Sequence, residues 1–135
     1  MNKKIFLFAV ISIISIIFVG CKKFETTGTV IENQNVYTSI DPILGQDYKL
    51  QVDTTVAGSL TIAIVSGTPP ATTPVGDPET IDKIFKEEGS SNYSFQTGIM
   101  SGNFSILSAD QIKISFVRNT PPYLSVRDVI CAKNN

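Results

Sequence analysis

The sequence YKLQVD at Tyr48–Asp53 leads, through a turn at Val56–Gly58, into SLTIAIVS at Ser59–Ser66. In the first segment apolar and polar residues alternate, as they do in a strand with one face on the core and the other in water. The second segment is apolar on both faces, which predicts a central strand. Together the two segments predict that the domain is built from β-strands.

Similar short segments, bounded by Gly, Pro, Asn and Asp, follow along the chain from Thr26 onward, with little sustained helical period. About eight short antiparallel strands at roughly ten-residue spacing predict an all-β domain, a β-sandwich. We expect a turn at Ser101–Asn103 and a loop at Asn119–Pro122. The other predicted strands are Thr27–Glu32, Asn35–Ile40, Asn92–Ile99, Phe104–Ser108, Gln111–Arg118 and Tyr123–Cys131.

Two segments between the predicted strands, Gly67–Gly76 and Asp77–Gly89, lack a clear strand pattern. Gly67–Gly76 contains three prolines, which cannot donate hydrogen bonds within a sheet, so we expect a long surface loop there. Asp77–Gly89 has a helix-capping Asp, a following Pro, apolar residues at helical spacing and a closing Gly, which together favour one short helix. The alternative is a strand at Ile81–Lys86 that forms a hairpin through Gly89–Ser91 with the strand that follows.

The amino-terminal stretch Met1–Cys21 has the layout of a secretory signal, with Lys3 and Lys4 before the apolar run Ile5–Val19. The run ends in Phe18-Val19-Gly20-Cys21, which resembles the lipobox of bacterial lipoproteins. The resemblance implies removal of the signal and acylation of Cys21, which would anchor the protein to a membrane of the bacterial cell envelope, in the periplasm or at the surface. An uncleaved membrane helix and an ordinary cleaved signal are the alternatives. The predicted organisation is a signal peptide at 1–20, a lipid-anchored tether at 21–26, a β-sandwich at 27–132 and a flexible tail at 133–135.

Composition excludes several classes of function. Without Lys3 and Lys4 the chain has nine basic and twelve acidic residues, a net charge of −3, so we expect no nucleic-acid partner. The sequence has no histidine, which removes the commonest general base and metal ligand, and it has no phosphate-binding glycine loop or zinc spacing. We therefore predict a protein that is not an enzyme and has no catalytic residues.

The chain has two cysteines, Cys21 and Cys131. If Cys21 carries lipid, Cys131 has no partner for a disulfide within the chain, and the domain must be held by its core. We expect Cys131 to be a small buried apolar residue. A surface thiol that pairs with another chain is the alternative.

Three segments resemble parts of galactose-binding-like jelly-roll domains, the superfamily that includes many carbohydrate-binding modules: Asp41–Val52, Gly58–Ile64 and Leu124–Cys131. The resemblance implies jelly-roll wiring and a carbohydrate ligand. In the last segment, an inward orientation of the apolar residues on both sides requires a bulge at Arg127–Asp128. Members of this superfamily often hold a structural calcium ion, for which the candidate ligands here are Asp41, Asp47 and Asp128.

Sugar binding ordinarily needs an exposed aromatic side chain with polar neighbours. The best candidates are Tyr37 and Tyr123, with Asp128 as a polar partner, and the loops that would present a ligand site are Gly67–Gly76 and Asn119–Tyr123. The sequence thus favours a lipid-anchored, non-catalytic binding module for a glycan or protein. The alternative is a structural or assembly lipoprotein that contacts another envelope protein through its sheet surface.

Overall fold

The computed structural model describes residues 24–25, 31–45 and 47–135, and within these residues it contains strands and no helix. The predicted all-β class is confirmed. The predicted short helix in Asp77–Gly89 is wrong. The strands are β1 (Phe24–Glu25), β2 (Val36–Ser39), β3 (Tyr48–Asp53), β4 (Leu60–Thr68), β5 (Ala71–Pro74), β6 (Glu79–Ile81), β7 (Ile84–Glu87), β8 (Asn92–Gln96), β9 (Met100–Ser108), β10 (Gln111–Arg118) and β11 (Leu124–Lys133).

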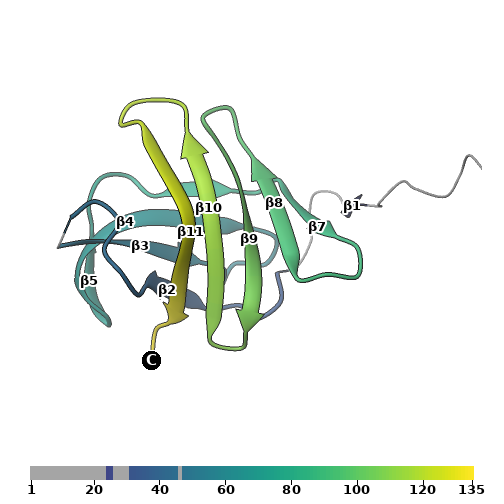
Figure 1. Cartoon of the computed structure of the whole chain (residues 1–135), viewed down its shortest axis with the longest axis horizontal. Coiled ribbons are helices and arrows are strands. Elements are labelled where there is room, and N and C mark those ends of the chain that lie inside the picture. Colours follow the sequence, from purple (N-terminus) through teal and green to yellow (C-terminus); the bar gives the residue numbers. More distant parts are fainter. Residues whose placement is uncertain (1–23, 26–30, 46) are drawn as a thin grey trace, which may run out of the picture.

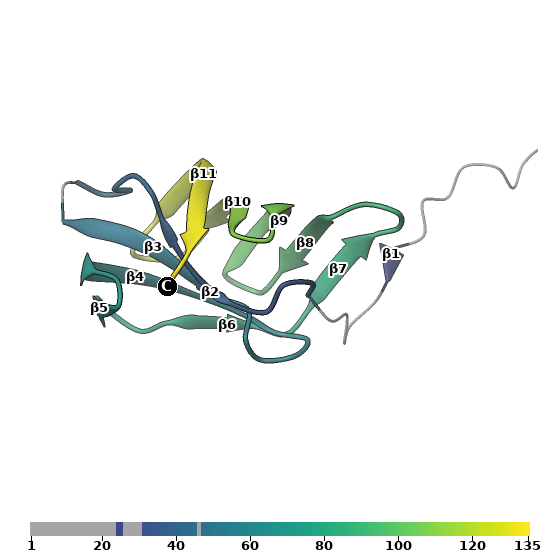
Figure 2. The ribbon, with the colours of Figure 1, turned by 90° about the horizontal axis from the view of Figure 1, so that it is seen from below.

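The strands form one antiparallel sheet in the order β1-β7-β8-β9-β10-β11-β2-β3-β4-β5, with β6 paired to β4. The sheet folds over on itself at the β11–β2 pair, so that β7 to β11 form one layer and β2 to β6 form the other (Figures 1 and 2). The strands of the two layers cross each other, and the predicted sandwich is confirmed. Neighbouring strands are mostly consecutive in sequence, so the wiring is two meanders joined by one pair and differs from the jelly-roll wiring that the resemblance implied.

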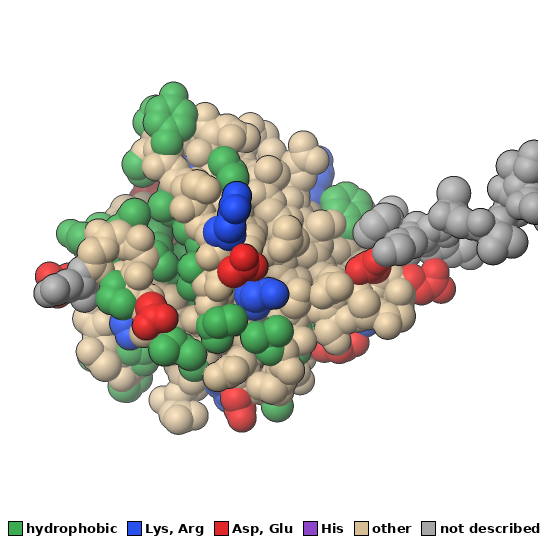
Figure 3. Space-filling model, in the orientation of Figure 1, with side chains coloured by type: hydrophobic (Ala, Val, Ile, Leu, Met, Phe, Trp, Pro, Cys, Tyr) green, Lys and Arg blue, Asp and Glu red, His purple; other side chains and the backbone are tan. Residues whose placement is uncertain are grey.

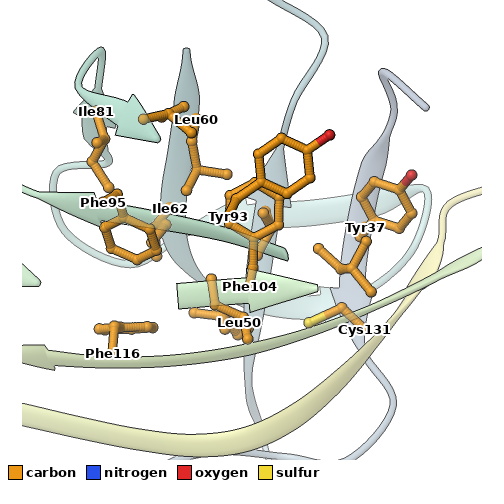
Figure 4. Packing of buried hydrophobic residues seen from close by; sticks show 14 of the residues in the cluster. Tyr37, Leu50, Leu60, Ile62, Ile81, Tyr93, Phe95, Phe104, Phe116 and Cys131 are labelled. Atoms are coloured by element: carbon orange, nitrogen blue, oxygen red, sulfur yellow. The ribbon is translucent and has the colours of Figure 1, made fainter. Parts of the chain in front are cut away.

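The core lies between the two layers, where side chains from both point toward one another (Figure 4). Its centre is aromatic: the rings of Tyr93 and Phe104 stack with their centroids 4.6 Å apart, and Phe95 packs against Phe104 at 6.5 Å. Leu50 of β3 and Leu60 of β4 are fully buried against this group. Burial of these large side chains supplies most of the driving force for folding.

The segments Tyr48–Asp53 and Ser59–Ser66 form strands, as predicted. β3 covers the same residues as the predicted strand, and Leu50 and Val52 are its buried positions. β4 is central, because it pairs with β3, β5 and β6, and both of its faces contain buried residues such as Leu60 and Val65.

Segments rich in Pro and Gly differ most from the predictions. The predicted loop Gly67–Gly76 contains the end of β4 and all of β5, which form a hairpin at the sheet edge, where prolines are tolerated. The predicted turn Ser101–Asn103 lies within β9. β11 continues to Lys133, the first residue of the predicted tail, and the Asn134 N–H donates a 2.8 Å hydrogen bond to the Val36 carbonyl.

Asp77–Gly89 forms two short strands, β6 and β7, in place of a helix. β6 pairs with β4 in one layer and β7 pairs with β8 in the other, so this segment carries the chain between the layers. Ile81 of β6 and Ile84 of β7, one on each side of the step between the layers, are both fully buried. The hairpin of β7 and β8 through Gly89–Ser91, the alternative to the helix, is the observed structure.

The predicted bulge at Arg127–Asp128 is confirmed. Ile114 of β10 lies opposite Val129, and Phe116 lies opposite Val126, so that the single residue Ser115 faces both Arg127 and Asp128. Asp128 has a φ of 50°, and its N–H donates a 2.8 Å hydrogen bond to Ser115 Oγ. The bulge lets apolar residues on both sides of it face the core.

The predicted signal peptide, Cys21 and the start of the predicted strand Thr27–Glu32 lie outside the described residues. Of the predicted tether, Phe24–Glu25 forms β1, which pairs with Lys86 and Glu87 of β7. Glu32, two residues after the second gap, forms a 2.6 Å ion pair with Lys86. In the part of the chain that is described, no helix has the length and apolar character to cross a bilayer.

Candidate ligand-binding site

A cavity of about 380 Å³ opens between the two layers where β10 ends and β11 begins. Its apolar wall includes Ile62 of β4, Phe116 of β10 and Leu124 of β11. The charged residues in its lining are Arg118, Asp77 and Glu79. A volume of this size, with apolar and polar groups both in the wall, lies within the range of small-molecule sites.

The fold brings these groups together from distant parts of the sequence. Glu79 lies opposite Ile62 in the β4–β6 pair, and Arg118 lies opposite Leu124 in the β10–β11 pair. The β10–β11 loop is fixed where it begins, because the Asn119 N–H donates a 2.7 Å hydrogen bond to the Ile99 carbonyl. The cavity is therefore formed by both layers.

Both loops predicted to present a ligand site contribute to this cavity. Val75 and Gly76, at the end of the segment Gly67–Gly76, line one side. Pro121 and Pro122, from the loop Asn119–Tyr123, line another. Sequence reasoning thus found the loops that border the cavity, although it assigned the first of them the wrong local structure.

Arg118 is the polar residue with the most unusual environment in the cavity. Its Nε is buried and has no hydrogen-bond partner within the described protein. Among the described residues, no carboxylate lies within 4.0 Å of its guanidinium, although Asp77 and Glu79 line the same cavity. A buried N–H group without an acceptor is costly, and this sets Arg118 apart from the other polar residues of the cavity.

Tyr123 stands next to the cavity and is 75% exposed, as predicted from the sequence. It borders a shallow hollow together with Asn119 and with Arg118 and Leu124, which also line the cavity. Figure 3 shows hydrophobic side chains projecting at the tip of the β10–β11 loop. An exposed ring beside polar groups is the arrangement that stacking on a sugar requires.

The other two predicted ligand-binding residues lie elsewhere. Tyr37 is 1% exposed and its hydroxyl donates a 2.7 Å hydrogen bond to the Asn33 carbonyl, so the prediction that it is an exposed platform is wrong. Asp128 is exposed in the bulge, where Lys113 Nζ lies 4.0 Å from its carboxylate, and it does not line the cavity.

The three candidate calcium ligands do not form a cation site. Asp41 and Asp47 flank the connection between β2 and β3, whereas Asp128 lies in the β11 bulge, and all three are exposed. Within the described residues no group of three or more acidic, cysteine or histidine side chains is placed to hold a metal ion. Asp41, Asp47 and Asp128 are therefore not gathered into such a group, and their role as calcium ligands stays a prediction.

Cys131 is fully buried in β11, as predicted. Loss of solvent around the sulfur raises the pKa of its thiol to about 12, because burial penalises the thiolate. The thiol is therefore protonated and unreactive at neutral pH, and it serves as packing.

Sequence reasoning missed Arg118, Asp77 and Glu79. A signal for Arg118 was present, since a lone basic residue ends an alternating strand directly before a proline-rich loop. The two carboxylates carried no such signal, because they belonged to the segment interpreted as a helix. Comparisons with known protein families, with curated proteins and with solved structures found no match for this chain.

Proposed function

We propose that this protein is a non-catalytic binding module of the bacterial cell envelope, held to a membrane by lipid on Cys21, and that the cavity at Arg118 binds a glycan. One observation carries the binding part of the proposal. The two loops singled out from the sequence border one cavity lined by Arg118, a half-buried arginine with no ion-pair partner among the described residues, and an exposed tyrosine lies beside it.

The chemistry of the cavity suits sugar binding. Arg118 can donate hydrogen bonds, and Asp77 and Glu79 can accept them from hydroxyl groups. The apolar wall and Tyr123 offer surfaces on which the C–H face of a sugar ring can pack. The chain contains no histidine, which supports binding without catalysis.

The place of β1 bears on how the cavity would be presented. β1 pairs with β7, and in both ribbon views it lies at the opposite end of the molecule from β5 (Figures 1 and 2). No residue of β1 or β7 lines the cavity. If Cys21 is lipidated, only Lys22 and Lys23 separate it from β1, so the β7 end would lie close to the membrane and leave the cavity accessible.

A glycan screen tests the binding proposal. The full-length protein, purified in a detergent without a sugar head group, is applied to an array of glycans alongside the Arg118→Ala variant. We expect the native protein to bind at least one class of glycan and the variant to lose most of that signal. If the native protein binds no glycan on the array, the proposal is refuted.

The alternative, assembly with another envelope protein, is favoured by a different observation. Ile40, Leu44 and Tyr48, around the connection between β2 and β3, are 49%, 52% and 39% exposed. Exposed apolar side chains near one another are typical of contact surfaces. This function would be favoured if the glycan screen gives no binding and an envelope protein cross-links to the native chain. The cross-link should be lost when Ile40 and Leu44 are both changed to Ser.

A further inference from the structure

We infer that the ligand of the cavity is a sugar that carries a carboxylate. The inference rests on the proposed function and specifies its ligand class. Arg118 lines the cavity, its Nε is buried without a partner within the described protein, and no carboxylate of the described residues pairs with it. The planar guanidinium has donors arranged to match the two oxygens of a carboxylate, and such charge-assisted bonds are among the strongest in proteins.

The position of the two acidic residues supports a ligand with an acid group. Asp77 and Glu79 line the cavity but lie more than 4.0 Å from the guanidinium, so no ion pair occupies its donors. Glu79 is half-buried and Asp77 is exposed, and both residues line the cavity and carry acceptor oxygens. A ligand must therefore combine an acceptor at Arg118 with donors at the carboxylates.

A simple anion does not meet these requirements. Acetate or phosphate could contact Arg118 but carries no sugar hydroxyl groups to donate hydrogen bonds to Asp77 and Glu79. A neutral sugar supplies hydroxyl donors but no charged partner for the guanidinium. A sugar acid such as glucuronate supplies both, and its ring can pack against Phe116 and Leu124.

The test measures affinities of the full-length protein, in a detergent without a sugar head group, for two matched pairs by titration calorimetry. The pairs are glucuronate with glucose and galacturonate with galactose, and acetate is the anion control. In at least one pair we expect the acid to bind about tenfold tighter or more than the neutral sugar, and acetate to bind weakly. Raising sodium chloride from low to high concentration should weaken only the acid, because salt screens charged contacts.

Variants locate the effect. Arg118→Gln should bind the acid and the neutral sugar equally, whereas Arg127→Gln, which changes an exposed arginine outside the cavity, should keep the native preference. Arg118→Lys retains the positive charge but lacks the planar pair of N–H donors, so it should lose part of the preference for the acid. This variant replaces Arg118→Gln in the test if the Gln variant does not fold.

The outcomes separate the two proposals. Equal binding of acid and neutral sugar by the native protein would overturn this inference and leave the glycan function standing. A preference that survives in Arg118→Gln would also overturn it. Failure of every sugar to bind, in the screen and in the titration, would overturn both.

Discussion

Gly102 lies within β9, where its missing side chain permits close approach of the neighbouring strands. It faces Phe95 of β8 and Phe116 of β10 across the two adjoining pairs. A Cβ on residue 102 would lie 2.6 Å from the Phe116 Cβ and 2.8 Å from the Phe95 ring, and it would overlap the Ser115 carbonyl oxygen. Two of these three atoms belong to the backbone or sit next to it and cannot rotate away.

The Gly102→Ala substitution should therefore destabilise the fold. Overpacking a tight core costs about 1–3 kcal/mol, and the upper part of that range applies when backbone must move. The gain from replacing a strand glycine by alanine, about 0.5–1 kcal/mol, offsets part of this cost. We expect a net loss of about 2 kcal/mol in the free energy of unfolding.

Gly98 provides the matched control, because a Cβ there would meet no atom within 4 Å. Gly98→Ala should change the free energy of unfolding by about 0.5 kcal/mol or less. Urea unfolding followed by circular dichroism compares the two variants, and a loss of 2 kcal/mol should lower the midpoint by roughly 1 M. Equal midpoints for the two variants would refute the packing argument and the placement of residue 102 inside a strand.

Three further predictions concern the core and the bulge. Phe104→Ala should lower the free energy of unfolding by about 3–5 kcal/mol in the same urea assay, because Phe104 is fully buried and stacks on Tyr93; a loss below 1 kcal/mol would contradict this. The raised pKa of Cys131 predicts that the free energy of unfolding is unaffected by this thiol below its ordinary pKa of 9.0 and falls as the pH rises toward 12, because only the unfolded chain ionises in that range. Between pH 9 and 10 the free energy of unfolding of the native protein should fall by about 1 kcal/mol more than that of Cys131→Ala. Parallel pH profiles of the two proteins would contradict this. Asp128→Val should cost about 1–2 kcal/mol because of the positive φ at the bulge, whereas Asp128→Gly should cost little; equal effects would show that the backbone conformation at residue 128 is not left-handed.

The alternation of apolar and polar residues predicted strands correctly in segments where one face of the strand is buried and the other is exposed. β3 and β10 match their predicted bounds because each has one buried face, so period two is visible in the sequence. The bulge in β11 was predictable because apolar residues on both sides of Arg127–Asp128 cannot otherwise face the core. In these segments local sequence and tertiary packing favour the same structure.

Predictions failed where tertiary contacts override local signals. Asp77, Pro78 and Gly89 favour a helix locally, but pairing of this segment with β4 and β8 buries Ile81 and Ile84 on the two sides of the sandwich. Gly102 suggests a turn in the sequence, whereas the structure uses it for close approach of Phe95.

In the candidate site too, residues whose environment depends on nearby sequence were predicted and residues whose environment depends on tertiary packing were not. Tyr123 was predictable because a tyrosine next to two prolines in a loop has little to pack against. Tyr37 was predicted wrongly, since its burial depends on packing between the layers and on the carbonyl of Asn33. Arg118, Asp77 and Glu79 converge only through the crossing of the chain between layers, which no local pattern reveals.

Mass spectrometry of the native amino terminus, on protein extracted from membranes of a bacterial host, tests the proposed anchor most directly. We expect a mature chain that begins at Cys21 and carries diacylglycerol on its sulfur, and a Cys21→Ser variant that is neither processed at this site nor lipidated. A free, unacylated chain that starts after Gly20, or a full-length chain that still begins at Met1, would contradict it.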